Sequence, residues 1–144
     1  LGQLRLLSKI LKRNAKRRVL FFSGSGTNGR KNNYSAYTLS KILLIKFVEL
    51  LDSEEKKIIA GILGPGFIKT KIHNNKKIKV SKNEINKIKK IINFIHWFFS
   101  QPKKIVGGRN FSLVNDKLQS KKIIKFLKSN KDNFKLRRYG NNSL

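Results

Sequence analysis

The chain has 144 residues, a length typical of one domain, and its 34 Lys and Arg against 7 Asp and Glu give a formal net charge of +27. The absence of cysteine excludes disulfides, thiolate metal sites and cysteine nucleophiles, and with only two histidines, His73 and His96, we expect no metal site. No apolar run reaches about 18 residues and no secretory leader opens the chain, so we expect a soluble, cytoplasmic protein without a membrane span.

The first half of the chain predicts a helix, a strand and a second helix. Residues 1–14 carry leucine and isoleucine at helical spacing. Residues 18–22 are an unbroken apolar run, typical of a strand buried on both faces, and end at the small-residue loop 23–29. Residues 34–52 form the strongest predicted helix, whose apolar stripe is Ala36, Leu39, Leu43, Leu44, Phe47, Leu50 and Leu51.

The second half predicts a strand, a loop, a helix, a strand and a short helix. Ser81 and Glu84 form a capping box at the start of the longer helix, where the aromatic residues of 94–99 indicate core or subunit packing. The predicted elements are a strand over 57–63 that ends at Gly64-Pro65-Gly66, a lysine-rich loop over 70–82, a helix to about Phe99, a strand over 107–114 and a helix over 119–128, before a polar tail.

Apolar strands that alternate with helices are typical of βαβ units. We therefore expect an α/β fold: a partial Rossmann-like (doubly wound) parallel sheet of three C-terminal strands with flanking helices. The first strand would leave one edge of the sheet open unless an earlier strand covered it. Because the chain also begins at Leu1 and contains no methionine, we expect a fragment of a longer reading frame.

Tyr37 and Lys41 are four residues apart at the start of a predicted helix, so both side chains can point into one site. An ammonium group near a phenol stabilises the phenolate, which makes the tyrosine usable as a general acid or base. Serines of the preceding loop could orient a substrate oxygen. Ligands of open α/β sheets bind at the carboxyl ends of the strands, where all these residues lie in the sequence.

At these residues the chain resembles the short-chain dehydrogenase/reductase family. Tyr37-x-x-x-Lys41, within Asn33-Tyr-Ser-Ala-Tyr-Thr-Leu-Ser-Lys41, matches the catalytic pair of that family. The segment Pro65-Gly-Phe-Ile-Lys-Thr70 is similar to its proline-glycine turn after the next strand. The resemblance covers residues 1 to about 115, in the order of the family.

The resemblance implies hydride transfer between NAD or NADP and a carbonyl or alcohol substrate. Tyr37 would exchange a proton with the substrate oxygen, and Lys41 would hold the nicotinamide ribose. The turn residues Pro65, Gly66, Ile68 and Thr70 would border the nicotinamide. Members of the family commonly form dimers or tetramers through the helix of the tyrosine, so a homodimer or homotetramer is expected.

Two features depart from the family pattern. The serine of the family lies thirteen residues before the tyrosine, and here that position is Gly24. Ser23 and Ser25 flank it, and we favour Ser25 for the catalytic role, with the alternative that each serine bonds only to loop backbone. The resemblance implies that the glycine-rich cofactor loop after the first strand of the family would precede Leu1, so we expect the 144 residues to be inactive alone.

From this resemblance we expect two parts. Residues 1–115 are the C-terminal part of an NAD(P)-binding domain, and residues 116–144 are a helix and a polar tail.

A different interpretation is that the chain is a basic nucleic-acid-binding protein without catalysis. The cations are 26 Lys and only 8 Arg, and Arg is the better residue for phosphate forks, so we expect contacts with nucleic acid to be non-specific. A third interpretation is that the chain is the product of a decayed gene remnant.

Overall fold

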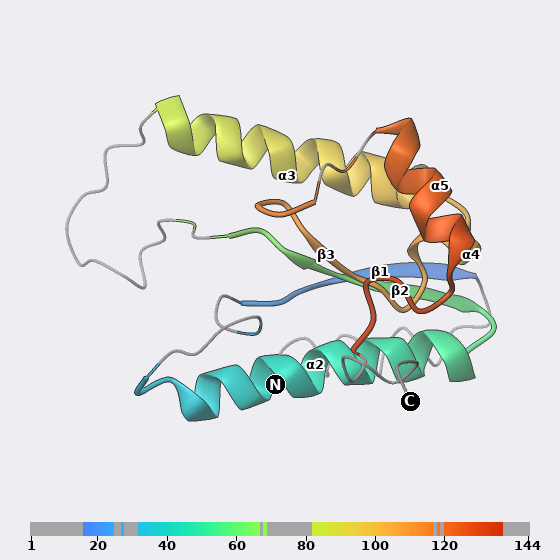
Figure 1. Ribbon diagram of the computed structural model, residues 1–144, viewed down its shortest axis with the longest axis horizontal. Coiled ribbons are helices and arrows are strands. Elements are labelled where there is room, and N and C mark those ends of the chain that lie inside the picture. The colour runs from blue at the N-terminus through green and yellow to red at the C-terminus, as the bar shows by residue number, and fades with distance from the viewer. Residues whose placement is uncertain are drawn as a thin grey trace, which may run out of the picture.

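The computed structural model describes residues 16–24, 27, 32–66, 68, 82–116, 118 and 120–136. Three parallel strands form a sheet with helices on both of its faces (Figure 1). The expected α/β class with a partial Rossmann-like parallel sheet is therefore confirmed. The elements are β1 (Arg17–Phe22), α2 (Ser35–Glu54), β2 (Ile58–Gly64), α3 (Lys82–Ser100), α4 (Lys103–Val106), β3 (Asn110–Ser112) and α5 (Lys121–Ser129).

The strand order is β1-β2-β3, so β2 is the central strand. It pairs with β1 from Arg17↔Ile58 to Phe22↔Leu63 and with β3 from Ile62 to Gly64. The central strand is almost fully buried, as its apolar sequence predicts. The expectation of burial on both faces fails for β1, where Phe21 is buried but Phe22 is exposed; an edge strand has a neighbour on one side only.

Among the described helices, α2 is the one that covers the first face of the sheet (Figure 1). Its buried residues are Ile45, Val48, Glu49, Leu51 and Asp52. The predicted apolar stripe is confirmed at Leu44, Phe47 and Leu51, which pack in the core with the sheet, and is wrong at its other four residues. Apolar residues occur on every side of this helix. The side that meets the sheet is the one on which the carboxylates of Glu49 and Asp52 also have bonding partners. The stripe residues Leu39, Leu43 and Leu50, as well as Ala36, are instead exposed.

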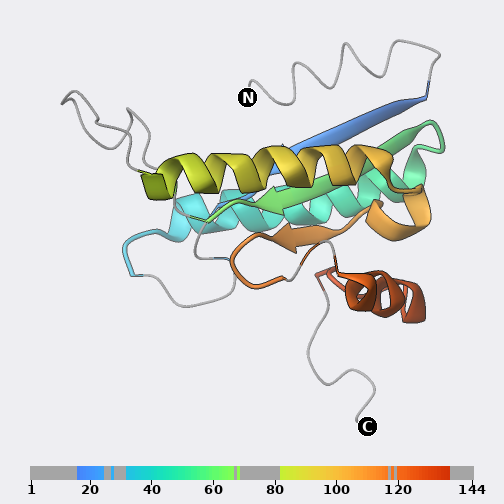
Figure 2. The same ribbon diagram turned by 90° about the horizontal axis from the view of Figure 1, so that it is seen from above.

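The opposite face is covered by α3, α4 and α5 (Figure 2). The ring of Phe98 lies so close to Gly61 that a Cβ at Gly61 would overlap it. Phe94, Phe98 and Phe111 fill the centre of this core, with Trp97 at its side. The aromatic residues of α3 thus form core, except Phe99, which is exposed.

The third strand is shorter than the predicted 107–114. Residues 103–106 form the single turn of α4, and Gly108 has a φ of 67°, which breaks the extended backbone. The Gly108 amide donates to the Ala60 carbonyl at 2.7 Å, so the pair Gly107-Gly108 is held as a turn against β2. The last helix begins at Lys121, because the Ser120 hydroxyl accepts from the Ile123 amide.

Some expectations lie outside the described residues: the helix over 1–14, the loop over 70–82, the capping box at Ser81, His73 and the tail after residue 136. Among the described helices, none has the length and apolar character needed to cross a bilayer.

Candidate functional site

The candidate site begins at the carboxyl end of β1. The Ser23 amide donates to the Leu63 carbonyl at 2.9 Å, which continues the sheet pairing by one residue. The Ser23 side chain is buried, with its Oγ 3.1 Å from the point that a Cβ on Gly64 would occupy. This serine is therefore fixed between the ends of two strands. Ser25, the other serine candidate, lies outside the described residues.

Tyr37 lies directly over Gly24. A Cβ built on Gly24 would overlap the Tyr37 hydroxyl, so the phenol reaches the backbone at the position where the family pattern has its serine. The tyrosine ring is 43% exposed, which leaves it accessible to a ligand. Glycine at position 24 thus permits an approach that a side chain would obstruct.

Lys41 lies one turn further along α2, on the same side of the helix. Its ammonium is 5.6 Å from the centroid of the Tyr37 ring, a cation–π distance. Tyr34 makes an edge contact with Tyr37 at 6.4 Å between ring centroids. The start of α2 therefore holds the phenol between a cation and a second aromatic ring, and the predicted Tyr37–Lys41 pair is brought together.

The turn after β2 forms the second wall of the site. Gly66 has a φ of 77°, a left-handed conformation that favours glycine, and a Cβ there would lie 2.7 Å from Val114 Cγ2. The Leu113 amide donates to the Gly64 carbonyl at 3.0 Å, which ties this turn to the end of β3. Pro65 and Ile68, predicted to border a nicotinamide, are half-buried here. Thr70 lies outside the described residues.

A cavity of about 210 Å³, hereafter the strand-end cavity, lies where the three strands end. Its walls include Ser23 and Gly24 after β1, Gly64 and Gly66 after β2, and Asn110 and Ser112 of β3. This is the position at which open α/β sheets bind ligands. Gly24 is a wall residue and also the contact of the Tyr37 hydroxyl, so the phenol lies next to one wall of this cavity, whereas neither Tyr37 nor Lys41 is itself a lining residue.

Two polar residues at the end of β3 were not among the predicted site residues. The side-chain oxygen Oδ1 of Asn110 is buried and has no hydrogen-bond partner. The Asp116 carboxylate accepts from the Ser112 amide at 2.7 Å, and burial raises the pKa of Asp116, while that bond opposes the shift. The only sequence signal for them was a run of polar residues around the short apolar strand.

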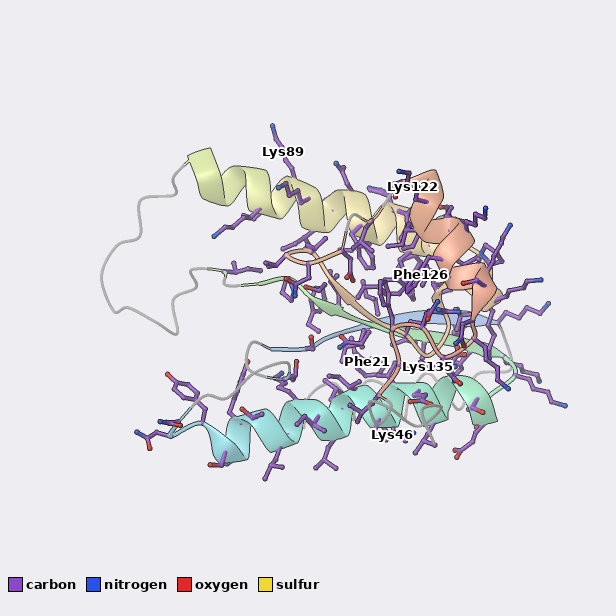
Figure 3. The ribbon with its side chains drawn as sticks, viewed as in Figure 1. Phe21, Lys46, Lys89, Lys122, Phe126 and Lys135 are labelled. Atoms are coloured by element: carbon purple, nitrogen blue, oxygen red, sulfur yellow. The ribbon has the colours of Figure 1, made fainter. Side chains whose placement is uncertain are left out.

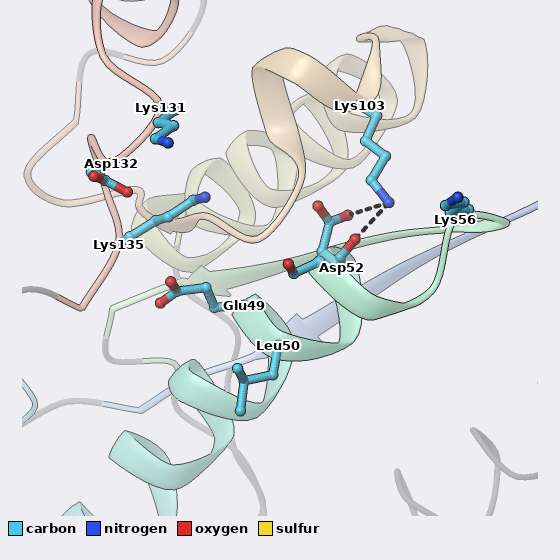
Figure 4. Close-up of a pocket in the computed structure, with 9 residues that line it drawn as sticks. Glu49, Leu50, Asp52, Lys56, Lys103, Lys131, Asp132 and Lys135 are labelled. Carbon is cyan, nitrogen blue, oxygen red and sulfur yellow. Dashed lines mark hydrogen bonds and ion pairs between the residues drawn. The ribbon is translucent and has the colours of Figure 1, made fainter.

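A cavity of about 590 Å³ lies at the other end of the sheet (Figure 4). Asp52 and Lys103 form an ion pair at 3.6 Å across it, and Lys46 pairs with Glu49 at 3.3 Å beside it. Burial raises the pKa of Asp52, although the Ala60 amide and Lys103 oppose that shift. Asp52 and Lys103 bond to each other and to backbone, which indicates a stabilising network.

His96 is exposed on α3. Within the part of the chain that the structure describes, no group of three or more His, Asp or Glu could hold a metal ion.

In comparisons with known proteins, no family model matches the chain, and neither a curated protein nor a solved structure matches it. The interpretation of the site therefore depends on the residues and their geometry.

Proposed function

We propose that this chain supplies the acid–base part of an NAD(P)-dependent oxidoreductase of the short-chain dehydrogenase/reductase type. The observation that carries the proposal is the position of the Tyr37 hydroxyl, against Gly24 and beside the strand-end cavity, with the Lys41 ammonium 5.6 Å from its ring. A phenol beside a ligand-sized cavity and a cation has the chemistry of a general acid or base.

In this proposal Tyr37 gives a proton to the oxygen of a ketone as it is reduced, or takes one from an alcohol as it is oxidised. The cofactor, when bound, supplies or accepts the hydride. Lys41 holds its ribose, and the turn residues Pro65, Gly66, Ile68 and Thr70 border its nicotinamide end. Gly66 has the left-handed conformation that this turn requires, and Val114 packs against it.

The pyrophosphate part of the cofactor needs a different segment. A strand, a glycine-rich turn and a helix N-terminus normally bind it, and the one such pattern in the 144 residues, Gly24-x-Gly26-x-x-Gly29 after β1, is the loop that this proposal places against Tyr37 at the substrate end of the site. We therefore include in the proposal that a segment outside these residues completes the cofactor site and that the 144 residues alone have no turnover. Ketone- or alcohol-dependent turnover by the purified 144-residue chain would overturn this part.

The test uses a chain that is extended by translating the source DNA upstream of the Leu1 codon, assayed for ketone-dependent oxidation of NADH and NADPH. Tyr37→Phe should lower kcat by about 10²- to 10⁴-fold, the usual contribution of a general acid. Tyr34→Phe is the matched control, because that ring stands at the same helix start, is similarly exposed and contacts Tyr37. Equal activity of Tyr37→Phe and wild type would refute the proposal.

We also propose that the complete protein is a homo-oligomer through the outer face of α2. Leu39 and Leu43 are 60% and 69% exposed there, and Leu50 is on the same face. Exposed apolar stripes of this kind mark interaction surfaces. Sedimentation should show a dimer or tetramer that Leu43→Glu dissociates and that Leu136→Glu, a change of an exposed leucine elsewhere, leaves intact. A monomeric wild type contradicts this part.

A second candidate function, non-specific binding of nucleic acid, is favoured by an uneven distribution of charge. Helices α3, α4 and α5 together contain ten lysines and one glutamate, whereas α2 contains two lysines and three carboxylates. Figure 3 shows Lys89 and Lys122 on the layer of α3 and α5 and Lys46 on α2. Lysines on one layer form the kind of surface that phosphates bind with release of counterions.

Two triple substitutions of equal charge test this candidate. Lys122, Lys125 and Lys128 on α5 are exposed, and changing all three to Gln should reduce the salt slope of binding to random duplex DNA by about 2 to 3. Lys46 on α2 and Lys56 and Lys57 in the turn after α2 are the control, expected to leave that slope nearly unchanged. An equal reduction of the salt slope in both variants would show that the chain attracts DNA diffusely, without a defined binding surface.

A further inference from the structure

Asn110 has a buried acceptor that nothing in the described part of the chain satisfies. Its backbone amide donates to the Phe134 carbonyl at 2.8 Å, so the residue is held in place, but its Oδ1 has no hydrogen-bond partner. At least nine in ten buried polar groups in native proteins are paired. An acceptor held without a partner in a cavity wall is an unfavourable arrangement for the empty protein and a favourable one for a ligand that donates to it.

Two adjoining cavities share the Asn110 wall. One is the strand-end cavity of about 210 Å³, and the other, of about 310 Å³, lies between α2 and the end of β3. Asn110 and Ser112 line both, and Ile42, Ile45 and Phe134 give the second one an apolar side beside its polar residues. A single water occupies about 30 Å³ of liquid, so the space suits a larger molecule than the one water that Oδ1 could bind.

The polar groups around this space restrict the chemistry of that molecule. Asn110 Oδ1 can only accept a hydrogen bond. The Asp116 carboxylate, which accepts from the Ser112 amide, and Lys135 both line the second cavity, so charges of opposite sign offset one another there and a neutral molecule is favoured. Apolar walls with a few convergent acceptors are typical of sites for small, mostly apolar ligands that carry N–H or O–H groups.

We propose that the paired cavities around Asn110 bind a small neutral molecule with an apolar body and an N–H or O–H donor that bonds to Asn110 Oδ1. The site does not require hydride transfer. Should the oxidoreductase proposal hold as well, this molecule is its substrate, because Gly24 forms part of the same wall and contacts the Tyr37 hydroxyl. Binding and turnover are measured separately, so either proposal can fail alone.

The experiment compares two probes that differ in one group. Benzamide and acetophenone share a ring and a carbonyl, but only benzamide has an N–H donor. Each is titrated into the ¹⁵N-labelled 144-residue chain, and shifts of the Asn110 side-chain amide and of backbone amides 110–116 are followed by NMR. Benzamide should bind about fivefold more tightly, the effect of one net hydrogen bond. Equal affinities, or no shifts from either probe, would overturn the proposal.

Asn110→Leu removes the acceptor with little change of shape. It should abolish the preference for benzamide while leaving the Tm unchanged or raised, because the free protein loses an unsatisfied buried group. Asn115→Leu, an exposed residue that lines the same two cavities, is the control and should keep the preference. A large fall in Tm for both Asn110→Leu and Asn110→Ala would show that Asn110 is structural and would refute a ligand role.

Discussion

The Lys103 ammonium lies on the connection between α2 and β2, where it donates to the Asp52 carbonyl at 2.6 Å and stands 3.6 Å from the Asp52 carboxylate. The same carboxylate accepts from the Ala60 amide at 3.0 Å and lies where a Cβ on Gly107 would be. One lysine and one aspartate thus join α2, β2 and α4 at the end of the sheet opposite the candidate site.

This network predicts that replacing Lys103 and replacing its neighbour Lys104 have very different effects on the free energy of unfolding. Lys103 also donates to the Glu55 and Ile58 carbonyls, at 3.1 and 2.9 Å, so Lys103→Met removes a donor from three carbonyls and leaves the Asp52 carboxylate without its cation. We expect it to lower the free energy of unfolding by about 2 to 3 kcal/mol. Lys104→Met, at an exposed site, should change it by less than about 0.5 kcal/mol. Urea unfolding measures both, and equal effects would contradict the network.

The close approaches at Gly61 and Gly24 predict opposite tolerance of the same change. At Gly61 an added methyl group meets the fully buried ring of Phe98 and stands 3.3 Å from the Val106 carbonyl, so neither neighbour can move easily. Gly61→Ala should therefore lower the free energy of unfolding by about 1 to 3 kcal/mol. At Gly24 the obstacle is the end of the half-exposed Tyr37 side chain, which can rotate away.

Gly24→Ala should accordingly cost less than about 1 kcal/mol. It should also change the surroundings of Tyr37, which the NMR signals of its ring protons would report. A Gly24→Ala variant that is as unstable as Gly61→Ala, or whose Tyr37 signals match the wild type, would contradict the contact described here.

The elements of this fold could be predicted because their signals are local. The apolar runs before Gly24 and Gly64 and the helical spacing after Tyr34 depend only on neighbours in the sequence. The buried face of α2 could not be predicted, since Leu39 and Leu43 have the same hydrophobicity as the residues that pack. Which face meets the sheet depends on partners such as Ala60, whose amide bonds to Asp52.

The candidate site was predictable to a similar degree. The pair Tyr37–Lys41 follows from helix geometry alone. The contact of Tyr37 with Gly24, and the place of Asn110 in the cavity wall, depend on how the ends of three strands meet. No local pattern encodes a contact between residues of different elements.

Arg109 predicts a local effect on the last helix. It is 3% exposed and donates to the carbonyls of Leu127 and Asn133, at 2.8 and 2.7 Å. Burial lowers the pKa of Arg109, and Asp132 opposes the shift. Arg109→Met should leave these carbonyls without a donor and lower the free energy of unfolding by about 2 to 3 kcal/mol.

Hydrogen exchange locates that loss. Amides of α5 should exchange faster in Arg109→Met, while those of β2 change only as far as global stability falls. Lys125→Met, an exposed change on α5 itself, is the control and should leave the exchange of α5 unaltered. Unchanged protection of α5 in Arg109→Met would show that the guanidinium does not hold the helix.

Asp116 predicts a pH dependence of stability with a definite sign. Burial raises the pKa of Asp116 in the folded chain above its ordinary value of about 3.9. Between these two values the folded state binds a proton that the unfolded state has lost, so the stabilisation from this proton is full at low pH and disappears as the pH rises through the raised value. Asp116→Asn removes the titration and keeps an oxygen for the Ser112 amide.

The difference in unfolding free energy between wild type and Asp116→Asn should therefore fall as the pH increases from about 3 to about 7. Asp116→Ala separates the charge from the hydrogen bond, because it loses the acceptor that stands 2.7 Å from the Ser112 amide and should be less stable than Asp116→Asn at every pH. If the difference in unfolding free energy between wild type and Asp116→Asn rose with pH instead, the fold would stabilise the Asp116 carboxylate as an anion. The cavity beside Asn110 would then carry a favourable negative charge. Such a cavity would suit a cationic ligand better than a neutral one.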